Sequence, residues 1–202
     1  MVKISPQAAW ENHLQQPSMK ARWLEDSKDI SKALPLSKRE LFGLIILAYL
    51  QNHTNNSKDW FVGYDSGASE PNDGFVSDGK SRIDVEHKII PQMSTQNPLE
   101  AILSTYEKYA KKGIAYGGGR TIIIFPNLAT KGLIKISSLR DKINGSSPFD
   151  RVLLMSTVAM SNNNTTANIH ITEHYPGEGI AQVDFNLLTG GASVPYYGIT
   201  SE

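Results

Sequence analysis

The sequence has no cysteine among its 202 residues, which excludes a disulfide scaffold, a cysteine-ligated zinc or iron–sulfur site, and a thiol nucleophile. It also has no excess of charge of either sign, because 20 Lys+Arg balance 20 Asp+Glu. This balance argues against a basic coat protein for nucleic acid and against an acidic tail. A neutral chain of this kind can bind DNA only through a local basic cleft.

Long apolar runs are scarce as well. The most apolar stretch, Leu41–Leu50, has ten residues and is far shorter than the ~20 residues needed to cross a bilayer. The N-terminus shows no apolar segment of the signal-peptide kind. We therefore expect a cytoplasmic protein that does not enter the membrane.

The chain is long enough to bury a core, and no repeat or linker divides it. Hydrophobic residues make up 40% of it, which is typical of a globular protein. We expect one domain over residues 1–202. Within it, residues 1–34 form a helical arm, residues 36–125 a central part, and residues 126–202 additional strands with a C-terminal hairpin.

Capping signals and periodicity predict the elements. A capping box of Ser37 and Glu40 begins an apolar helix that should lie centrally, and Asn97 caps a second helix. Strands are predicted over 60–64, 74–77, 82–90, 120–125 and 151–158, a short helix over 138–143, and a hairpin over 167–175 and 180–188. This order indicates an α/β (α+β) fold, with a central mixed sheet flanked by helices and an extra C-terminal hairpin.

A row of ionisable side chains lies on the strand predicted over residues 82–90. Successive side chains of a strand point to opposite faces, so Asp84, Glu86 and Lys88 share one face. His87 lies on the other face, which carries apolar residues and should pack on the core. Three ionisable groups in a row are costly to bury, so their face is expected to contact water or a ligand.

The length of the hairpin loop decides which carboxylate lies opposite Asp73. A four-residue loop over 78–81 sets Asp73 opposite Glu86, whereas a two-residue loop sets it opposite Asp84. Either loop keeps Asp73 on the face of Lys88. Two carboxylates can bind Mg²⁺ through oxygen, and a lysine beside them can orient an attacking water and offset charge in a transition state.

These residues also carry a resemblance. Asp73, the strand and turn that follow it, and Glu86-x-Lys88 resemble the signature of the PD-(D/E)xK nuclease superfamily, the fold of many restriction endonucleases. The predicted order of elements over 36–125 is similar to the αβββαβ core of that family. Asn72 stands directly before the aspartate where the family has proline, and the Gln-x-x-x-Tyr pattern of one branch is not evident.

The resemblance implies a restriction-endonuclease-like fold and a DNA endonuclease that depends on Mg²⁺ or Mn²⁺. Its substrate would be double-stranded DNA, cut by a homodimer of the type II restriction class. Asp73, Glu86 and Lys88 would be the catalytic residues. Asp73, Glu86 and the backbone carbonyl of His87 would bind the metal, and Glu40 could add a ligand or serve only its capping box. The alternative is a non-catalytic nuclease-like module that binds a protein or nucleic-acid partner. These residues could also form no more than a solvated hairpin face on which Glu86 and Lys88 make an internal pair.

Two further motifs lack the context that their chemistry needs. Residues 170–174 spell H-x-x-E-H, which binds zinc from a helix, but here they lie in a predicted strand. The glycines at 117–119 precede a strand and do not open a helix, so they do not form a phosphate-binding loop. Four basic residues could line a phosphate path or form a solvated helix end: Lys108, Lys111, Lys112 and Arg120.

Overall fold

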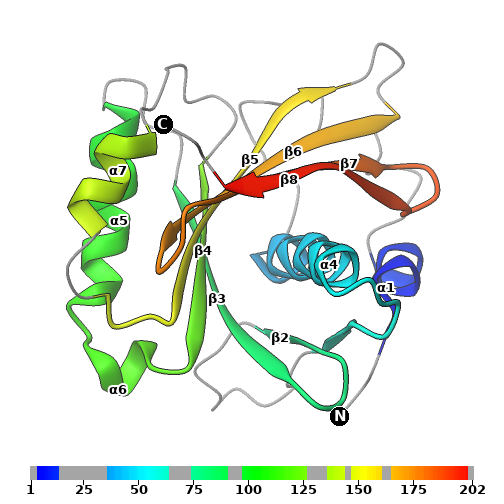
Figure 1. Cartoon of the computed structure of the whole chain (residues 1–202), viewed down its shortest axis with the longest axis horizontal. Helices are drawn as coiled ribbons and strands as arrows, with labels where there is room; N and C mark the ends of the chain where they lie inside the picture. The colour runs from blue at the N-terminus through cyan, green and yellow to red at the C-terminus, as the bar shows by residue number, and fades with distance from the viewer. Residues whose placement is uncertain are drawn as a thin grey trace.

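The computed structural model describes residues 4–13, 36–63, 74–90, 97–126, 136–143, 147–160 and 165–199. The helices (Figure 1) are α1 (Pro6–His13), α4 (Leu36–Thr54), α5 (Pro98–Ala110), α6 (Ile114–Gly117) and α7 (Ile136–Ile143). The strands are β1 (Phe61–Gly63), β2 (Gly74–Ser77), β3 (Arg82–Ile90), β4 (Arg120–Pro126), β5 (Arg151–Met160), β6 (Thr166–Tyr175), β7 (Gly179–Asn186) and β8 (Ala192–Ile199).

The strands form one eight-stranded sheet in which neighbours follow chain order from β1 to β8. The pairs β3–β4 and β4–β5 are parallel, and the other five pairs are antiparallel. Helices lie in the crossovers between the parallel strands, as such connections require. The mixed α/β class predicted from the sequence is confirmed, and the order α4, β1, β2, β3, α5, β4 follows the predicted order with α6 inserted.

The sheet curls around α4 (Figure 1). This helix contacts β1, β2 and β3 near one end of the sheet and β7 and β8 at the other. Residues on all sides of α4 are buried, among them Leu41, Phe42, Ile45, Ile46 and Leu50. An apolar surface all round a helix can be buried only if neighbours surround it, so the predicted central position of this helix is confirmed.

A second core lies on the outer face of the sheet, where α5 contacts β3 and β4 and α7 contacts β6. Ile102 of α5 and Leu139 of α7 pack there with Ile122 and Ile124 of β4 and Val152 of β5. Helices therefore cover both faces of the central parallel strands. Asn97 caps α5 as predicted, since its side-chain oxygen accepts the backbone N–H of Leu99 at 3.0 Å.

Two elements were not predicted. The one-turn helix α6 occupies part of the glycine-rich segment that the sequence indicated as a loop. The edge strand β8 carries a bulge, because Val194 and Pro195 lie between the pairs Gln182–Tyr196 and Asp184–Ser193. Proline and a bulge are both tolerated at a sheet edge, but they interrupt the alternation of side chains by which a strand is predicted. Of the predicted N-terminal arm, residues 1–3 and 14–34 lie outside the described residues.

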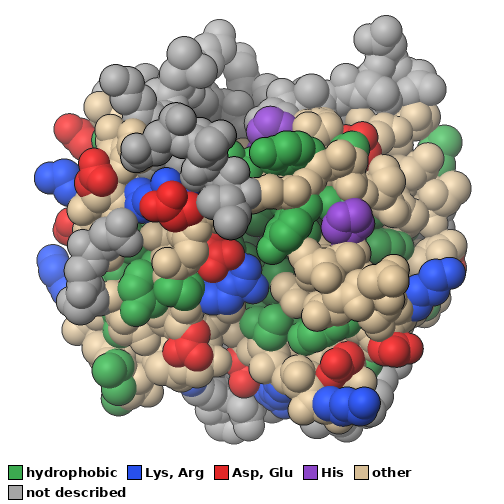
Figure 2. All heavy atoms as spheres, viewed as in Figure 1, with side chains coloured by type: hydrophobic (Ala, Val, Ile, Leu, Met, Phe, Trp, Pro, Cys, Tyr) green, Lys and Arg blue, Asp and Glu red, His purple; other side chains and the backbone are tan. Residues whose placement is uncertain are grey.

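Two surface features bear on the expected partners. Among the helices of the described ranges, none is both long enough and apolar enough to cross a bilayer. On the face shown in Figure 2, acidic and basic side chains are interspersed and neither sign forms a continuous surface. On this face a nucleic-acid contact therefore needs a local basic cluster.

Candidate functional site

The hairpin between β2 and β3 closes with the four-residue loop. Ser77 pairs with Arg82, and the register continues to the pair of Gly74 and Val85. The Asp78 carboxylate accepts the backbone N–H groups of Lys80 and Ser81 at 2.8 and 2.7 Å. These hydrogen bonds lower the pKa of Asp78. The loop thus has its own local stabilisation, and the first of the two predicted registers is confirmed.

Asp73, the predicted partner of Glu86 across this hairpin, lies outside the described residues, as does Asn72. The pairing of β2 with β3 is described up to Gly74 and Val85. The position of Asp73 opposite Glu86 therefore stays a prediction that rests on the observed register.

The structure brings Glu86 and Lys88 together on the outer face of the sheet. Glu86 is level with Ile122 and Lys88 with Ile124 of the parallel neighbour β4, and both isoleucines belong to the core under α5 and α7. The Lys88 ammonium forms an ion pair with Oε1 of Glu86. The Tyr116 hydroxyl of α6 donates a hydrogen bond to the same oxygen. This one carboxylate oxygen therefore accepts from both the Lys88 ammonium and the Tyr116 hydroxyl.

The expectation that this face is open to water is wrong for Glu86, whereas contact with a ligand stays a prediction. Its exposed fraction is 3%, and the Lys88 side chain is 16% exposed. Tyr116 lies over the carboxylate from α6, an element that the sequence did not predict. A buried carboxylate needs a nearby cation and hydrogen-bond donors, and Lys88 and Tyr116 supply both.

The second oxygen of Glu86, Oε2, is buried and has no hydrogen-bond partner among the described residues. A buried acceptor without a partner costs about 1–3 kcal/mol, so this oxygen suits a cation or a donor. The described residues contain no group of three His, Cys, Asp or Glu side chains that could hold a metal ion. Glu86 therefore offers one hard oxygen ligand, and a complete site also needs backbone oxygens or Asp73.

His87 points to the opposite face, as predicted. Its ring is buried against α4, where a Cβ added at Gly43 would lie 3.0 Å from the His87 ring, and it lies 5.9 Å from the Phe125 ring. Only the His87 backbone carbonyl stays a predicted ligand. Glu40 belongs to α4, which packs on this same face, whereas the Glu86 carboxylate points to the other. The structure does not bring Glu40 and Glu86 into a three-residue metal group within the described ranges.

The Asp84 carboxylate forms an ion pair with Arg82 of the same strand. Its Oδ1 accepts Arg82 Nε at 2.7 Å and pairs with Arg82 Nη2 at 2.6 Å. The Arg82 guanidinium lies 3.8 Å from the centre of the Phe75 ring. The row of three ionisable groups predicted on β3 is therefore divided into an Arg82–Asp84 pair and a Glu86–Lys88 pair.

Basic and aromatic side chains border the Glu86–Lys88 pair. The rings of Tyr109 and Tyr116 stack with centres 6.3 Å apart. Lys112 lies 4.8 and 4.1 Å from their centres, and Lys88 lies 4.7 Å from Tyr109. Lys108 and Arg120 complete this tyrosine–lysine rim, at 5.6 Å from Tyr109 and 5.2 Å from Tyr116. Cation–π contacts of this kind orient basic groups at little cost.

Tyr116 was not predicted as a site residue, because the run of glycines after it indicated a loop. Gly117 is needed for packing, since a Cβ there would lie 2.8 Å from the Pro148 carbonyl oxygen. Gly113 has a φ of 75°. This conformation favours glycine and separates helix α5 from helix α6. The seven-residue spacing of Tyr109 and Tyr116 was the available signal, but two tyrosines on separate helices stack only after folding.

Comparison of the chain with protein-family models, with curated proteins and with solved structures returned no match. Functional inference therefore depends on the geometry of the site.

The H-x-x-E-H segment lies in β6, as predicted, and its last residue, His174, is a buried histidine. His174 is fully buried, and its Nε2 lies 2.8 Å from the Thr172 hydroxyl. Burial lowers the pKa of His174 to about 4, and the charge of Arg140 acts in the same direction. The folded protein therefore holds this imidazole neutral in mildly acidic solution.

This buried histidine predicts a loss of stability in acid. Below its unfolded pKa of 6.5 the unfolded chain takes up the proton first, so the free energy of unfolding falls by up to ~1.4 kcal/mol per pH unit until about pH 4. Urea denaturation between pH 7 and pH 4 measures this slope. His174→Gln should flatten the slope, whereas the exposed control His53→Gln should not. Equal slopes in all three proteins would contradict the assignment.

Proposed function

We propose that the protein is a metal-dependent DNA endonuclease of the type II restriction class, which hydrolyses phosphodiester bonds of double-stranded DNA as a homodimer. The observation that supports this proposal best is the state of the Glu86 carboxylate. One oxygen is fixed by Lys88 and Tyr116, and the other is buried with no partner among the described residues. The carboxylate is thus oriented by the protein while one ligand position is left.

In this proposal Glu86, Asp73 and the His87 carbonyl would hold Mg²⁺ or Mn²⁺, and the ion would supply polarisation of a phosphoryl oxygen and a more acidic bound water. Lys88 orients the attacking water and offsets negative charge as it develops on the phosphate. Tyr116 keeps the Glu86 carboxylate in one orientation. The restriction-endonuclease-like fold is part of the same proposal, and the observed element order supports it.

The positive charges of the tyrosine–lysine rim can attract the phosphates of DNA to this site. Lys112 and Lys108 have no carboxylate partner among the described residues, and both lie over the Tyr109 ring beside Lys88. Phosphate contacts by such lysines supply most of the affinity of proteins for DNA. A chain with a formal net charge of +0 can therefore bind a polyanion here through a local cluster.

The direct test of function is cleavage of DNA of mixed sequence by the purified protein. We expect discrete fragments with Mg²⁺ or Mn²⁺ and none with a chelator present. Absence of cleavage over many sequences, together with retained DNA binding, would favour the non-catalytic nuclease-like module. The internal Glu86–Lys88 ion pair is the observation that favours this second function.

Metal binding is predicted to appear as thermal stabilisation. An ion that binds only the folded state at ten times its Kd adds about 1.4 kcal/mol to the free energy of unfolding, which raises the Tm by a few degrees. We expect this rise with millimolar Mn²⁺ in the wild type and its loss in Glu86→Gln. Glu107→Gln, an exposed change on α5, is the matched control. An unchanged wild-type Tm would count against a metal site.

Tyr116→Phe is predicted to weaken Mn²⁺ binding about tenfold while the fold is retained, because groups that orient a metal ligand are commonly worth ten- to a hundredfold in affinity. The variant removes only the hydroxyl that donates to Glu86. Tyr109→Phe, on the ring stacked beside it, should bind Mn²⁺ as the wild type does. Calorimetric titration measures both affinities, and equal values for the two variants would refute a positioning role of Tyr116.

A further inference from the structure

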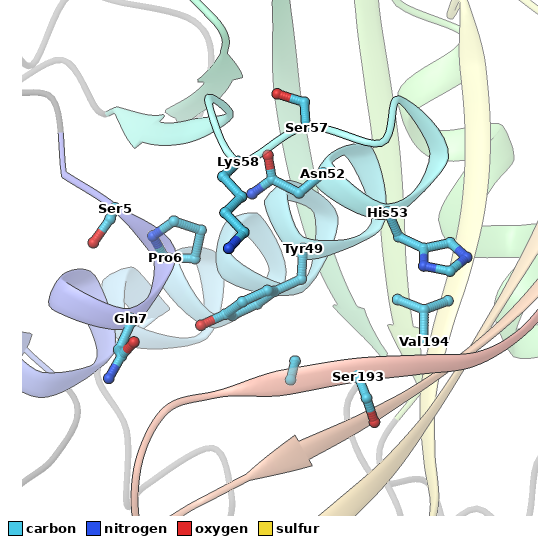
Figure 3. Close-up of a pocket in the computed structure, with 11 residues that line it drawn as sticks. Ser5, Pro6, Gln7, Tyr49, Asn52, His53, Ser57, Lys58, Ser193 and Val194 are labelled. Carbon is cyan, nitrogen blue, oxygen red and sulfur yellow. The ribbon is translucent and has the colours of Figure 1, made fainter.

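A concave site lies on the α4 side of the sheet, away from the face to which the Glu86 carboxylate points. It is an open groove of 740 Å³ between the start of α1, the end of α4 and the start of β8 (Figure 3). Ligand sites commonly have about 300–1,000 Å³, so the groove can admit a molecule of nucleotide size. None of the residues proposed for cleavage lines it.

The charge of the lining favours an anion. Lys58 and His53 are its basic residues, and it includes no Asp or Glu. Asp59, the acidic neighbour in sequence, accepts a hydrogen bond from the Ser57 hydroxyl at 3.1 Å. Figure 3 shows the Lys58 side chain extending into the space above the Tyr49 ring. Glu11, also outside the lining, accepts a hydrogen bond from Gln7 Nε2 at 3.0 Å. An anionic group in the groove would therefore meet the Lys58 ammonium, with no carboxylate in the lining itself.

The floor of the groove is apolar and fixed. Tyr49 donates a hydrogen bond from its hydroxyl to the Gly190 carbonyl at 2.7 Å, which ties the ring to the turn before β8. Burial, with a smaller effect of Glu11, raises the pKa of Tyr49 to about 12, so the phenol stays neutral. Ala192 and Val194 of β8 also line the groove, and Figure 3 shows Val194 near His53. A flat, weakly polar group can pack on this surface.

The edge strand beside the groove argues against an extended peptide as the occupant. Peptides add to a sheet edge through regular backbone hydrogen bonds. β8 carries a bulge at Val194 and Pro195. The bulge and the proline each oppose the addition of a strand at this edge. A small molecule that combines an anionic group with a flat ring fits the groove better.

We propose that this groove binds a nucleoside monophosphate, with the phosphate held by Lys58 and the base packed on the apolar part of the lining formed by Tyr49, Ala192 and Val194. The phosphate offers several acceptor oxygens to the Lys58 ammonium. The site is separate from the proposed nuclease centre and does not depend on it.

Calorimetric titration of the full chain with AMP tests this proposal. We expect saturable binding of AMP, with adenosine and inorganic phosphate each at least about tenfold weaker, since a hydrogen bond to a charged group contributes roughly tenfold or more. Lys58→Met should weaken AMP binding about tenfold. Lys58 is exposed, so the variant should keep the wild-type Tm. Lys111→Met, an exposed charge change at the end of α5, should bind AMP as the wild type does.

Three outcomes would overturn the proposal. The first is no saturable binding of AMP at millimolar concentration. The second is equal affinity for AMP and adenosine, which would show that the anionic group is not recognised. The third is an equal loss in the Lys58 and Lys111 variants, which would indicate unspecific charge attraction. Each outcome is independent of DNA cleavage, so failure here leaves the proposed nuclease function untouched.

Discussion

Replacing Lys88 with alanine is expected to reduce metal-dependent cleavage of plasmid DNA by about a hundredfold or more, because it removes the group that acts on the attacking water and on transition-state charge. DNA binding should persist, since phosphate contacts of the tyrosine–lysine rim do not require this ammonium. Gel-based cleavage rates and DNA-binding titrations, measured on the same preparations, separate the two effects.

The ion pair with Glu86 requires a second variant. Loss of Lys88 leaves a buried carboxylate without its cation, which can cost 3–5 kcal/mol of stability, a rough figure for buried pairs. Lys88→Arg keeps the positive charge beside Glu86, but a planar guanidinium places its N–H groups differently and does not hold the attacking water in the same position. We expect it to fold with a near-native Tm and still lose cleavage. Lys142→Ala, an exposed change on α7, is the control, and equal cleavage by all these proteins would show that the activity lies elsewhere.

Trp10→Ala is expected to lower the free energy of unfolding by about 3–5 kcal/mol, as large-to-small changes in cores do. Trp10 is 2% exposed. Its ring meets Phe185 edge-on at 4.8 Å and lies 6.2 Å from Phe42, so it joins α1 to β7 and α4. A Cβ added at Gly190 would collide with the indole, which shows how closely the turn before β8 packs on it.

Urea denaturation with a fixed m-value analysis measures this loss. Gln7→Ala, an exposed change on the same helix, should alter stability by no more than about 0.5 kcal/mol. Trp10→Phe keeps a ring in the cavity and should lose less than Trp10→Ala. A loss below about 1 kcal/mol for Trp10→Ala would mean that α1 adds little to the core.

Local patterns were sufficient for much of the fold. The alternation of β3 predicted that Glu86 and Lys88 share a face and that His87 lies on the other, and the structure agrees. The loop over 78–81 and the Asn97 cap are built from neighbours in sequence, so their hydrogen bonds need no distant partner. The all-round apolar surface of α4 required a surrounding sheet. Strand period, cap chemistry and apolar surface are properties of short segments, which is why one sequence suffices to predict them.

Tertiary structure alone decided what lies opposite those segments. Tyr116 lies 30 residues after Glu86 in the chain and donates a hydrogen bond to it. Arg82 pairs with Asp84, so Asp84 does not join Glu86 and Lys88. The curl of the sheet brings β8 to α4 and so creates the groove at Lys58. These contacts join residues far apart in the chain, and their energies depend on packing and burial that no short segment contains. The strand could therefore indicate which side chains share a face, whereas the burial of that face depended on helices packed across the sheet.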